Sequence, residues 1–230
     1  GINVTKLGSN AFGLCSSLEE IKLGDNLEFI GEYAFAFCNN LERIPCLKNV
    51  HTIESAAFYN CKNLSLIAFG DSIKAVGLNA FTGTQWLNDY EGDFVILPSG
   101  LLINYKGSDS LVTFPSNVTN IASGAFMDNQ KISKVIIPGS VKTISSHAFA
   151  FSSVEEVIIE DGLQYIGDQV FNECLNLRNI TIPESVTEIG SHIFLPEEGV
   201  NDYTITVHCK ENSVAHQYAI KAKQNVRIIK

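Results

Sequence analysis

The chain has 230 residues, of which 45% are hydrophobic, and its net charge is −9 from 25 acidic and 16 basic residues. This balance and the lack of a basic stripe exclude a nucleic-acid partner from our expectations. The longest apolar run, Tyr33 to Cys38, has six residues, whereas a membrane-spanning helix needs about 20, so we expect no membrane insertion.

A pattern of about 23 residues recurs along the chain. In its clearest copy, Val50 to Ser72, two apolar residues three apart precede Ala-Phe, a Cys, a Leu and an apolar-x-apolar triplet. The eight copies, numbered here as coils 1 to 8, begin at Val4, Leu27, Val50, Ile73, Val118, Val141, Leu163 and Val186. A fixed period of this length is the signature of a solenoid, in which stacked coils share one continuous core.

The first three coils show how each copy is expected to fold. The triplet, such as Ile21 to Leu23, has the period of a short strand, so stacked triplets predict a parallel sheet with one strand per coil. The spacing of three in Ala-Phe-x-x-Cys-x-x-Leu predicts a helical or 3₁₀ turn with one inward face. Gly, Pro, Asn, Asp and Ser after the strand predict tight corners.

The fourth coil is interrupted by an insert of about residues 86–111. Two apolar runs flank Pro98-Ser99-Gly100, which predicts a β-hairpin. The insert also contains Trp86, the single tryptophan, and Tyr90. Aromatic side chains often anchor interfaces, so both are candidate binding residues. The alternative is that Trp86 packs against the side of the coil.

Coils 5 to 8 continue the pattern until the eighth departs from it at Leu195. Residues 204–208 and 225–229 then predict strands, and residues 213–223 predict a helix with Ser213 as its N-cap. We expect this strand–helix–strand segment to cover the end of the core, as solenoids require. The predicted domains are therefore the repeats, residues 1–203, and the cap, residues 204–230.

The repeat motif resembles a known family. Ile-Gly-x-x-Ala-Phe-x-x-Cys-x-x-Leu, as in Ile30 to Leu41, and Ile-x-Ile-Pro-x-Ser-Val, as in Ile180 to Val186, are similar to the BspA-like class of leucine-rich repeats. The resemblance implies an α/β repeat fold: a right-handed leucine-rich-repeat solenoid with one short parallel strand per coil, a hairpin insert and a C-terminal cap. It also implies a secreted or surface-anchored bacterial protein, often linked to adhesion, without catalytic residues.

One repeat position holds a cysteine in four coils: Cys15, Cys38, Cys61 and Cys174. The expected spacing between coils, about 4.8 Å, permits disulfides between neighbours. The repeat equally explains these residues as a column of small buried thiols, which is the interpretation we favour. Spacings of 23 residues match no zinc motif. Cys46 lies at a strand position, so it too is expected in the core.

The sheet face that points away from the core is the predicted binding surface, because solenoid curvature makes such faces extended. Ile136 and Ile158 point outward in adjacent coils and predict an apolar strip rimmed by charge. The alternative is that outward isoleucines simply suit a strand. The candidate residues on this face are Leu66, Ala68, Lys134, Ile136, Glu156, Ile158 and Thr181.

These observations predict a non-enzymatic binding module of a secreted or surface protein that recognises a protein or a glycan. The alternatives are a structural spacer that displays other domains and, least favoured, an enzyme with the insert as a lid. No nucleophile elbow, phosphate loop or dinucleotide motif is present, so we predict no catalytic residue, metal or cofactor. The sequence opens at Gly1 without a basic and apolar leader, and we expect that a secretion signal was removed or that the sequence is shortened.

Overall fold

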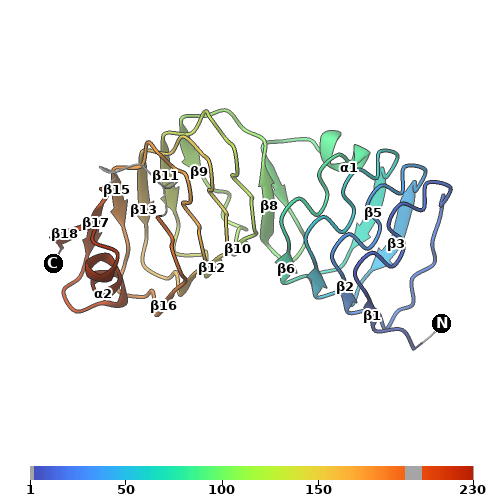
Figure 1. The fold of residues 1–230 in the computed structure, drawn as a ribbon, viewed down its shortest axis with the longest axis horizontal. Helices are drawn as coiled ribbons and strands as arrows, with labels where there is room; N and C mark the ends of the chain where they lie inside the picture. Colours follow the sequence, from blue (N-terminus) through green and yellow to red (C-terminus); the bar gives the residue numbers. More distant parts are fainter. Residues whose placement is uncertain (1–2, 195–203, 230) are drawn as a thin grey trace. The chain divides into compact units, whose positions relative to one another are not determined.

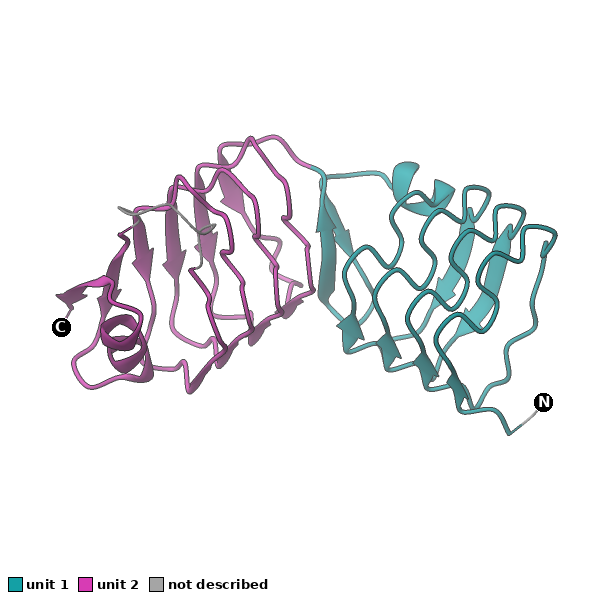
Figure 2. Cartoon of the chain, in the orientation of Figure 1, with its two compact units in different colours: residues 1–106 teal, residues 107–230 magenta. Residues whose placement is uncertain are grey.

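The computed structural model describes residues 3–194 and 204–229 (Figure 1). The chain divides into two compact units, unit 1 from Gly1 to Lys106 and unit 2 from Gly107 to Lys230 (Figure 2). Each unit is a parallel β-solenoid of stacked coils. The predicted departure from the repeat at Leu195 lies outside the described residues, as does residue 203 at the predicted domain boundary.

Unit 1 contains two parallel sheets and a hairpin. Two-residue strands, one per coil, form the first sheet: β1 (Lys6–Leu7), β2 (Phe29–Ile30), β4 (Thr52–Ile53) and β6 (Ala75–Val76). The second sheet pairs the predicted strands β3 (Arg43–Leu47) and β5 (Leu66–Phe69). The insert holds helix α1 (Gln85–Asn88) and an antiparallel hairpin of β7 (Phe94–Ile96) and β8 (Leu101–Tyr105). The hairpin was predicted from the sequence and is confirmed, whereas the two-residue strands and α1 were not predicted.

Unit 2 repeats this arrangement with a larger second sheet. Its two-residue strands are β10 (Asn120–Ile121), β12 (Thr143–Ile144), β14 (Tyr165–Ile166) and β16 (Glu188–Ile189). Its longer strands, which form one parallel sheet, are β9 (Leu111–Thr113), β11 (Lys134–Ile137), β13 (Glu156–Ile159), β15 (Asn179–Thr181), β17 (Thr206–Cys209) and β18 (Asn225–Ile228). Helix α2 (Val214–Lys221) lies between β17 and β18, and the Ser213 hydroxyl accepts from the His216 N–H as the predicted N-cap.

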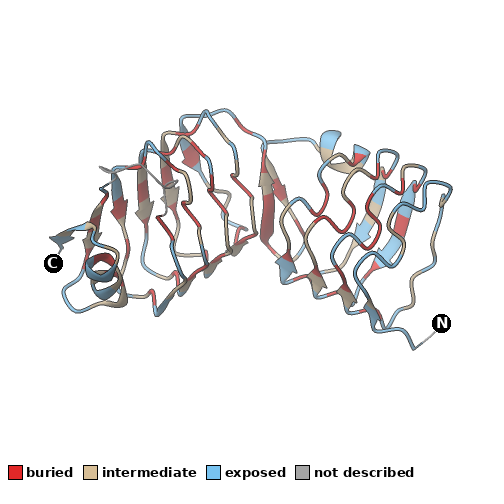
Figure 3. Cartoon of the chain, viewed as in Figure 1, coloured by how far each residue is buried: buried red, intermediate tan, exposed pale blue. Residues whose placement is uncertain are grey.

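Stacked phenylalanine rings run through the core of each unit. In unit 1 the rings of Phe12, Phe35, Phe58 and Phe81 follow one another with centroids 5.2, 5.1 and 5.4 Å apart. In unit 2 the corresponding column is Phe126, Phe149, Phe171 and Phe194, at 4.5, 5.4 and 6.1 Å. Buried residues accordingly face the inside of the coils from coil 2 onwards, whereas coil 1 at the end of the stack has none (Figure 3). Each stacked pair contributes about 0.5–1.5 kcal/mol beyond its burial.

Two residues in each of coils 1 to 7, here called the corner positions, adopt the left-handed backbone conformation, and His192 does so in coil 8. They lie two residues before and two residues after the column phenylalanine, as Tyr33 and Phe37 do around Phe35. At the described corner positions φ lies between 52° and 78°, and none of them carries Val, Ile, Thr or Pro. This agrees with the steric cost of β-branched residues at positive φ. The corner residues also replace the continuous 3₁₀ turn that the sequence predicted.

The left-handed residues turn alternate N–H groups towards the next coil. Tyr33, Phe35 and Phe37 donate to the carbonyls of coil 3 at 3.1, 2.7 and 2.8 Å. The residues between them, Ala34 and Ala36, donate to carbonyls within their own coil at 3.2 and 3.1 Å. A buried main-chain group without a partner is costly, so this alternation satisfies the corner and fixes the register between coils at once.

The repeated cysteines are free thiols that bond to the main chain. Cys38 Sγ donates to the Phe12 carbonyl at 3.0 Å, Cys61 Sγ to that of Phe35 at 2.9 Å and Cys174 Sγ to that of Phe149 at 3.0 Å. All six cysteines are free. The favoured interpretation, buried small thiols, therefore holds for Cys38, Cys61 and Cys174, whereas Cys15 in coil 1 is exposed.

The prediction for Cys46 is wrong, because its side chain is exposed. The pairing of β3 with β5 shifts between Ile44 and Leu47. This bulge adds one residue to the strand, so Leu47 is the residue that becomes buried. Cys46 therefore lies on the outer side of the sheet.

An aromatic ring from outside the repeat lies against the last phenylalanine of each column. In unit 1 it is Trp86 of α1, whose ring centroid lies 5.3 Å from that of Phe81. In unit 2 it is Tyr218 of α2, 6.1 Å from Phe194. The Tyr218 hydroxyl also accepts from the Ile193 N–H at 2.8 Å. Burial raises the pKa of Tyr218, and this hydrogen bond opposes the shift.

The left-handed conformation of Gln169, where φ is 52°, predicts that valine at this position destabilises the chain more than glycine does. Gln169→Val should lower the free energy of unfolding by about 1–2 kcal/mol, because a β-branched side chain clashes at positive φ. Gln169→Gly should be near neutral, since relief of strain offsets the entropy of glycine. Urea denaturation followed by circular dichroism tests this, with Glu188→Val on exposed β16 as the control. Equal effects of Val and Gly would contradict the assignment.

The buried thiols should resist modification. Burial raises the pKa of Cys61 to about 12 and that of Cys174 to about 11. At pH 8 we expect Ellman's reagent to modify Cys15 and Cys46 quickly, and the four buried cysteines only after denaturation. Since unfolded thiols lose their protons near pH 9 and these folded ones do not, the free energy of unfolding should fall as the pH rises above 9. Rapid reaction of all six native thiols would disprove this burial.

Candidate functional site

The outer sheet face of unit 2 brings together five of the predicted site residues. Ile136 pairs with Ile158 across β11 and β13, and Ile158 pairs with Thr181 of β15. Lys134 and Glu156 are cross-strand partners two residues before Ile136 and Ile158 on the same strands. All but the two isoleucines are polar, and all five are half-buried. The predicted apolar pair therefore exists, framed by polar residues of the same sheet.

Polar contacts hold the side chains around the isoleucine pair. Lys134 Nζ lies 2.7 Å from Glu156 Oε2. On the following strands His208, which pairs with Thr181, has its Nε2 3.3 Å from Asn179 Oδ1. Such exposed pairs add about 0–1 kcal/mol of stability. They do restrict how the side chains around Ile136 and Ile158 can move.

The outer sheet of unit 1 holds Leu66 and Ala68. Leu66 pairs with Arg43 of β3 and is 66% exposed, and Ala68 is also exposed. Arg43 in turn forms an ion pair with Glu20, and this hydrogen bond raises the Arg43 pKa. Leu66 is thus an isolated apolar side chain beside a charged pair, in contrast to the paired isoleucines of unit 2.

Trp86 and Tyr90 lie together, but they pack against unit 1 rather than stand free. The Trp86 ring is 5.0 Å from Phe69, 5.3 Å from Phe81 and 5.8 Å from Tyr90, measured between centroids. Lys106 Nζ donates to the carbonyls of Leu87, Asn88 and Tyr90 at 3.2, 3.1 and 2.8 Å. These bonds tie the segment around α1 to the end of the hairpin.

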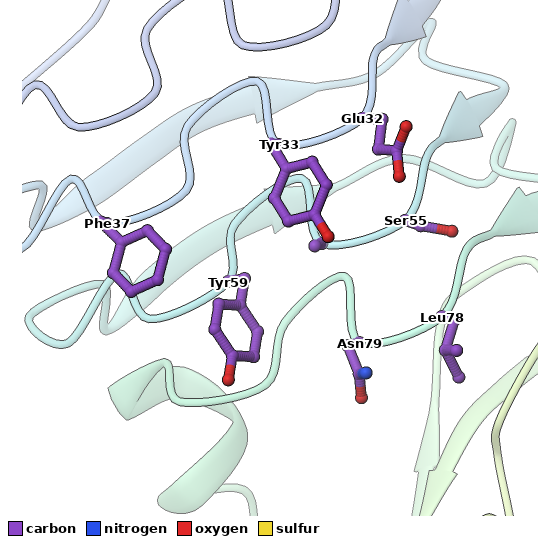
Figure 4. Close-up of a pocket in the computed structure, with 8 residues that line it drawn as sticks. Glu32, Tyr33, Phe37, Ser55, Tyr59, Leu78 and Asn79 are labelled. Carbon is purple, nitrogen blue, oxygen red and sulfur yellow. The ribbon is translucent and has the colours of Figure 1, made fainter.

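A groove that the sequence analysis missed lies along the corner positions of unit 1 (Figure 4). Its volume is about 560 Å³. Tyr33 and Phe37 come from coil 2, Tyr59 from coil 3, and Figure 4 shows their rings on one side of it. Its other lining residues are Glu32, Ser55, Ala56, Leu78 and Asn79. We call it the corner groove.

The sequence of the corner positions explains why this groove exists. The corner position before the phenylalanine holds Tyr33, Ala56 and Asn79 in coils 2, 3 and 4. Ala56 has the smallest side chain of the three and leaves a depression between its larger neighbours. Phe37 and Tyr59 close one end, with centroids 5.5 Å apart and rings at 78°. The available signal was the presence of two aromatic residues, Tyr33 and Phe37, on either side of the core phenylalanine of coil 2.

Two further findings apply to residues 3–194 and 204–229. Within these ranges no three His, Cys, Asp or Glu side chains are grouped so that they could hold a metal ion. Within them, too, neither helix has the length and apolar character needed to cross a membrane.

The repeat pattern matches one family model over most of the chain. The model describes the BspA type leucine-rich repeat region and matches six copies over residues 2–92 and 105–225. The chain belongs to this BspA-type leucine-rich repeat family. The unmatched residues 93–104 contain β7 and most of β8, so the hairpin is an insertion into the family repeat.

Solved leucine-rich repeat structures resemble this BspA-type chain in fold. A Bacteroides ovatus leucine-rich repeat protein is 18% identical over 98% of this chain and 66% of its own, with a TM-score of 0.39. A leucine rich cell surface protein of Faecalibacterium prausnitzii is 24% identical over 82% and 76%, with a TM-score of 0.35. The pneumococcal vaccine antigen PcpA is 16% identical over 100% and 78%, with a TM-score of 0.40. No curated protein matches this chain.

The packing of Trp86 in this BspA-type unit predicts a structural cost when it is removed. Trp86→Ala should lower the free energy of unfolding by about 2 kcal/mol, less than for a fully buried ring because the side chain is half-buried. Trp86→Phe should retain most of the contact with Phe81. Urea denaturation measures the loss, and hydrogen exchange should quicken at Phe81. An unchanged unfolding curve for Trp86→Ala would instead favour a role in binding alone.

Proposed function

We propose that this chain is a non-enzymatic binding module of a bacterial secreted or surface protein. We propose further that it recognises a protein through the outer sheet face of unit 2. The BspA-type repeat supports the first part, since solenoids of stacked coils present extended binding surfaces. The Ile136–Ile158 pair carries the second part.

The isoleucine pair has the form of an interface anchor. Two β-branched side chains lie next to each other in register on adjacent strands, so they offer one continuous apolar area. Thr113 and Thr181 extend the row on either side, and the Lys134–Glu156 pair forms a charged border. An apolar centre with a polar rim is the usual anatomy of a protein–protein interface.

The rigidity of the surface favours binding. Each long strand of unit 2 is hydrogen-bonded to its neighbours in continuous parallel register. The inward side chains that flank Ile136 and Ile158 on their own strands are buried: Val135, Ile137, Val157 and Ile159. The outward side chains are therefore held in place before a partner arrives. Binding to such a surface loses little conformational entropy.

The test is a comparison of captured partners. The wild-type chain and an Ile136→Glu/Ile158→Glu variant are immobilised and exposed to bacterial and host surface extracts, and bound proteins are quantified by mass spectrometry. We expect proteins that bind the wild type to lose at least about tenfold in affinity with the variant, because charge replaces the apolar centre. Circular dichroism verifies folding.

The control places the same charge elsewhere on unit 2. Gln164 and Thr187 are exposed residues just before β14 and β16, and Gln164→Glu/Thr187→Glu should leave binding unchanged. A partner that binds the folded Ile136→Glu/Ile158→Glu variant as tightly as the wild type would show that this face is not the site. A chain that retains no partner from any extract would favour the spacer function.

A further inference from the structure

The corner groove of unit 1 combines aromatic rings with a single negative charge. Tyr33 is 41% exposed and Phe37 is 38% exposed, so these two rings face solvent on either side of the buried column ring of Phe35. Among the described residues that line the groove, Glu32 is the only charged one, and Ser55 and Asn79 are polar. Figure 4 shows Glu32 beside Tyr33, at the end of the groove away from Phe37.

We propose that the corner groove binds a basic segment of a partner protein by receiving an arginine or lysine side chain. The face of an aromatic ring carries partial negative charge and attracts a cation within about 6 Å. The Glu32 carboxylate adds a full negative charge beside those rings. An anionic ligand would meet the like charge of Glu32 and no positive charge among the lining residues, so the charge of the lining is complementary to a cation.

The dimensions of the groove fit a side chain attached to a peptide rather than a free ion. A volume of about 560 Å³ lies within the range of sites that hold organic ligands. The groove spans three coils, from Tyr33 through Ala56 to Asn79. The guanidinium plane can stack on a ring. Ser55 and Asn79 line the same groove, so their polar side chains can form hydrogen bonds with the peptide main chain.

A second groove, at the corner positions of unit 2, also combines an exposed aromatic ring with acidic side chains. A groove of about 520 Å³ there is lined by Phe151, which occupies the same corner position as Phe37, with Asp128 and Glu173 at the equivalent positions of the coils on either side. Phe151 is 44% exposed. Arg178 Nη1 donates to the carbonyl of Leu175, another lining residue, at 2.8 Å. The Arg178 guanidinium therefore already lies beside the unit 2 groove. The unit 1 groove is the better one to test for binding of an external cation.

The experiment uses the full chain and two peptides that differ in charge alone. Acetyl-Gly-Ser-Arg-Ser-Gly-amide carries a guanidinium, and the same peptide with citrulline carries its neutral isostere. Each is titrated into the chain while the aromatic side-chain resonances are followed by NMR. We expect the arginine peptide to shift the Tyr33, Phe37 and Tyr59 ring signals and the citrulline peptide to shift them at least about two- to five-fold more weakly.

Variants taken from the chain's own repeat keep the backbone intact. Tyr33→Asn introduces the residue found at this corner position in coils 1 and 4, and Phe37→Asn the residue found in coil 3. Both should weaken binding of the arginine peptide without unfolding unit 1. Glu32→Gln should weaken it about two- to five-fold and reduce its salt dependence, whereas Glu42→Gln, at an exposed residue that does not line the groove, should not.

Three results would overturn the proposal. The first is equal binding of the arginine and citrulline peptides. The second is stronger shifts of the same rings with a neutral oligosaccharide, such as cellotetraose, than with the arginine peptide, which would make the groove a sugar site. The third is no ring shift with 10 mM arginine peptide. Because this test involves neither Ile136 nor Ile158, its outcome is independent of the sheet-face proposal.

Discussion

The hydrogen bonds that pass from each coil to the next at the corner positions constrain the rest of this structure. Three N–H groups of coil 2 donate to coil 3, and this requires residues with positive φ on both sides of each column phenylalanine. Main-chain bonds have a fixed length and direction, so they set the offset between coils. The phenylalanine rings then stack at 4.5–6.1 Å, and the cysteine thiols meet the carbonyl of the preceding coil.

The same constraint restricts the inward positions of each repeat but not its surface positions. Inward positions carry nearly identical residues because the core column and the thiol bonds demand them. Corner and outer-strand side chains lie outside this column, so their chemistry can differ from coil to coil without disturbing the register. The isoleucine pair of unit 2 and the aromatic groove of unit 1 both use positions of this kind. The fold is thus a scaffold on which separate binding chemistries can be placed.

Where prediction from the sequence failed, a local geometric cause can be named. Cys46 was expected in the core because the strand pattern was counted in steps of two, and the bulge before Leu47 shifts that count by one. The two-residue strands were not expected because two residues contain no period. The left-handed corners were not expected either, since Tyr, Phe, Gln and Glu occupy positions where glycine is the usual signal.

The sequence by itself determined the repeat, the hairpin and the Ser213 cap, because each depends on spacings within about one coil. It also placed Ile136 and Ile158 on one face, since a strand alternates its side chains regularly. Only the tertiary structure decided that Tyr33, Phe37, Tyr59 and Ala56 line one groove. The aromatic residues come from coils 2 and 3, and the groove between them exists because Ala56 has a small side chain. The repeat period does not encode such a difference in side-chain size between neighbouring coils.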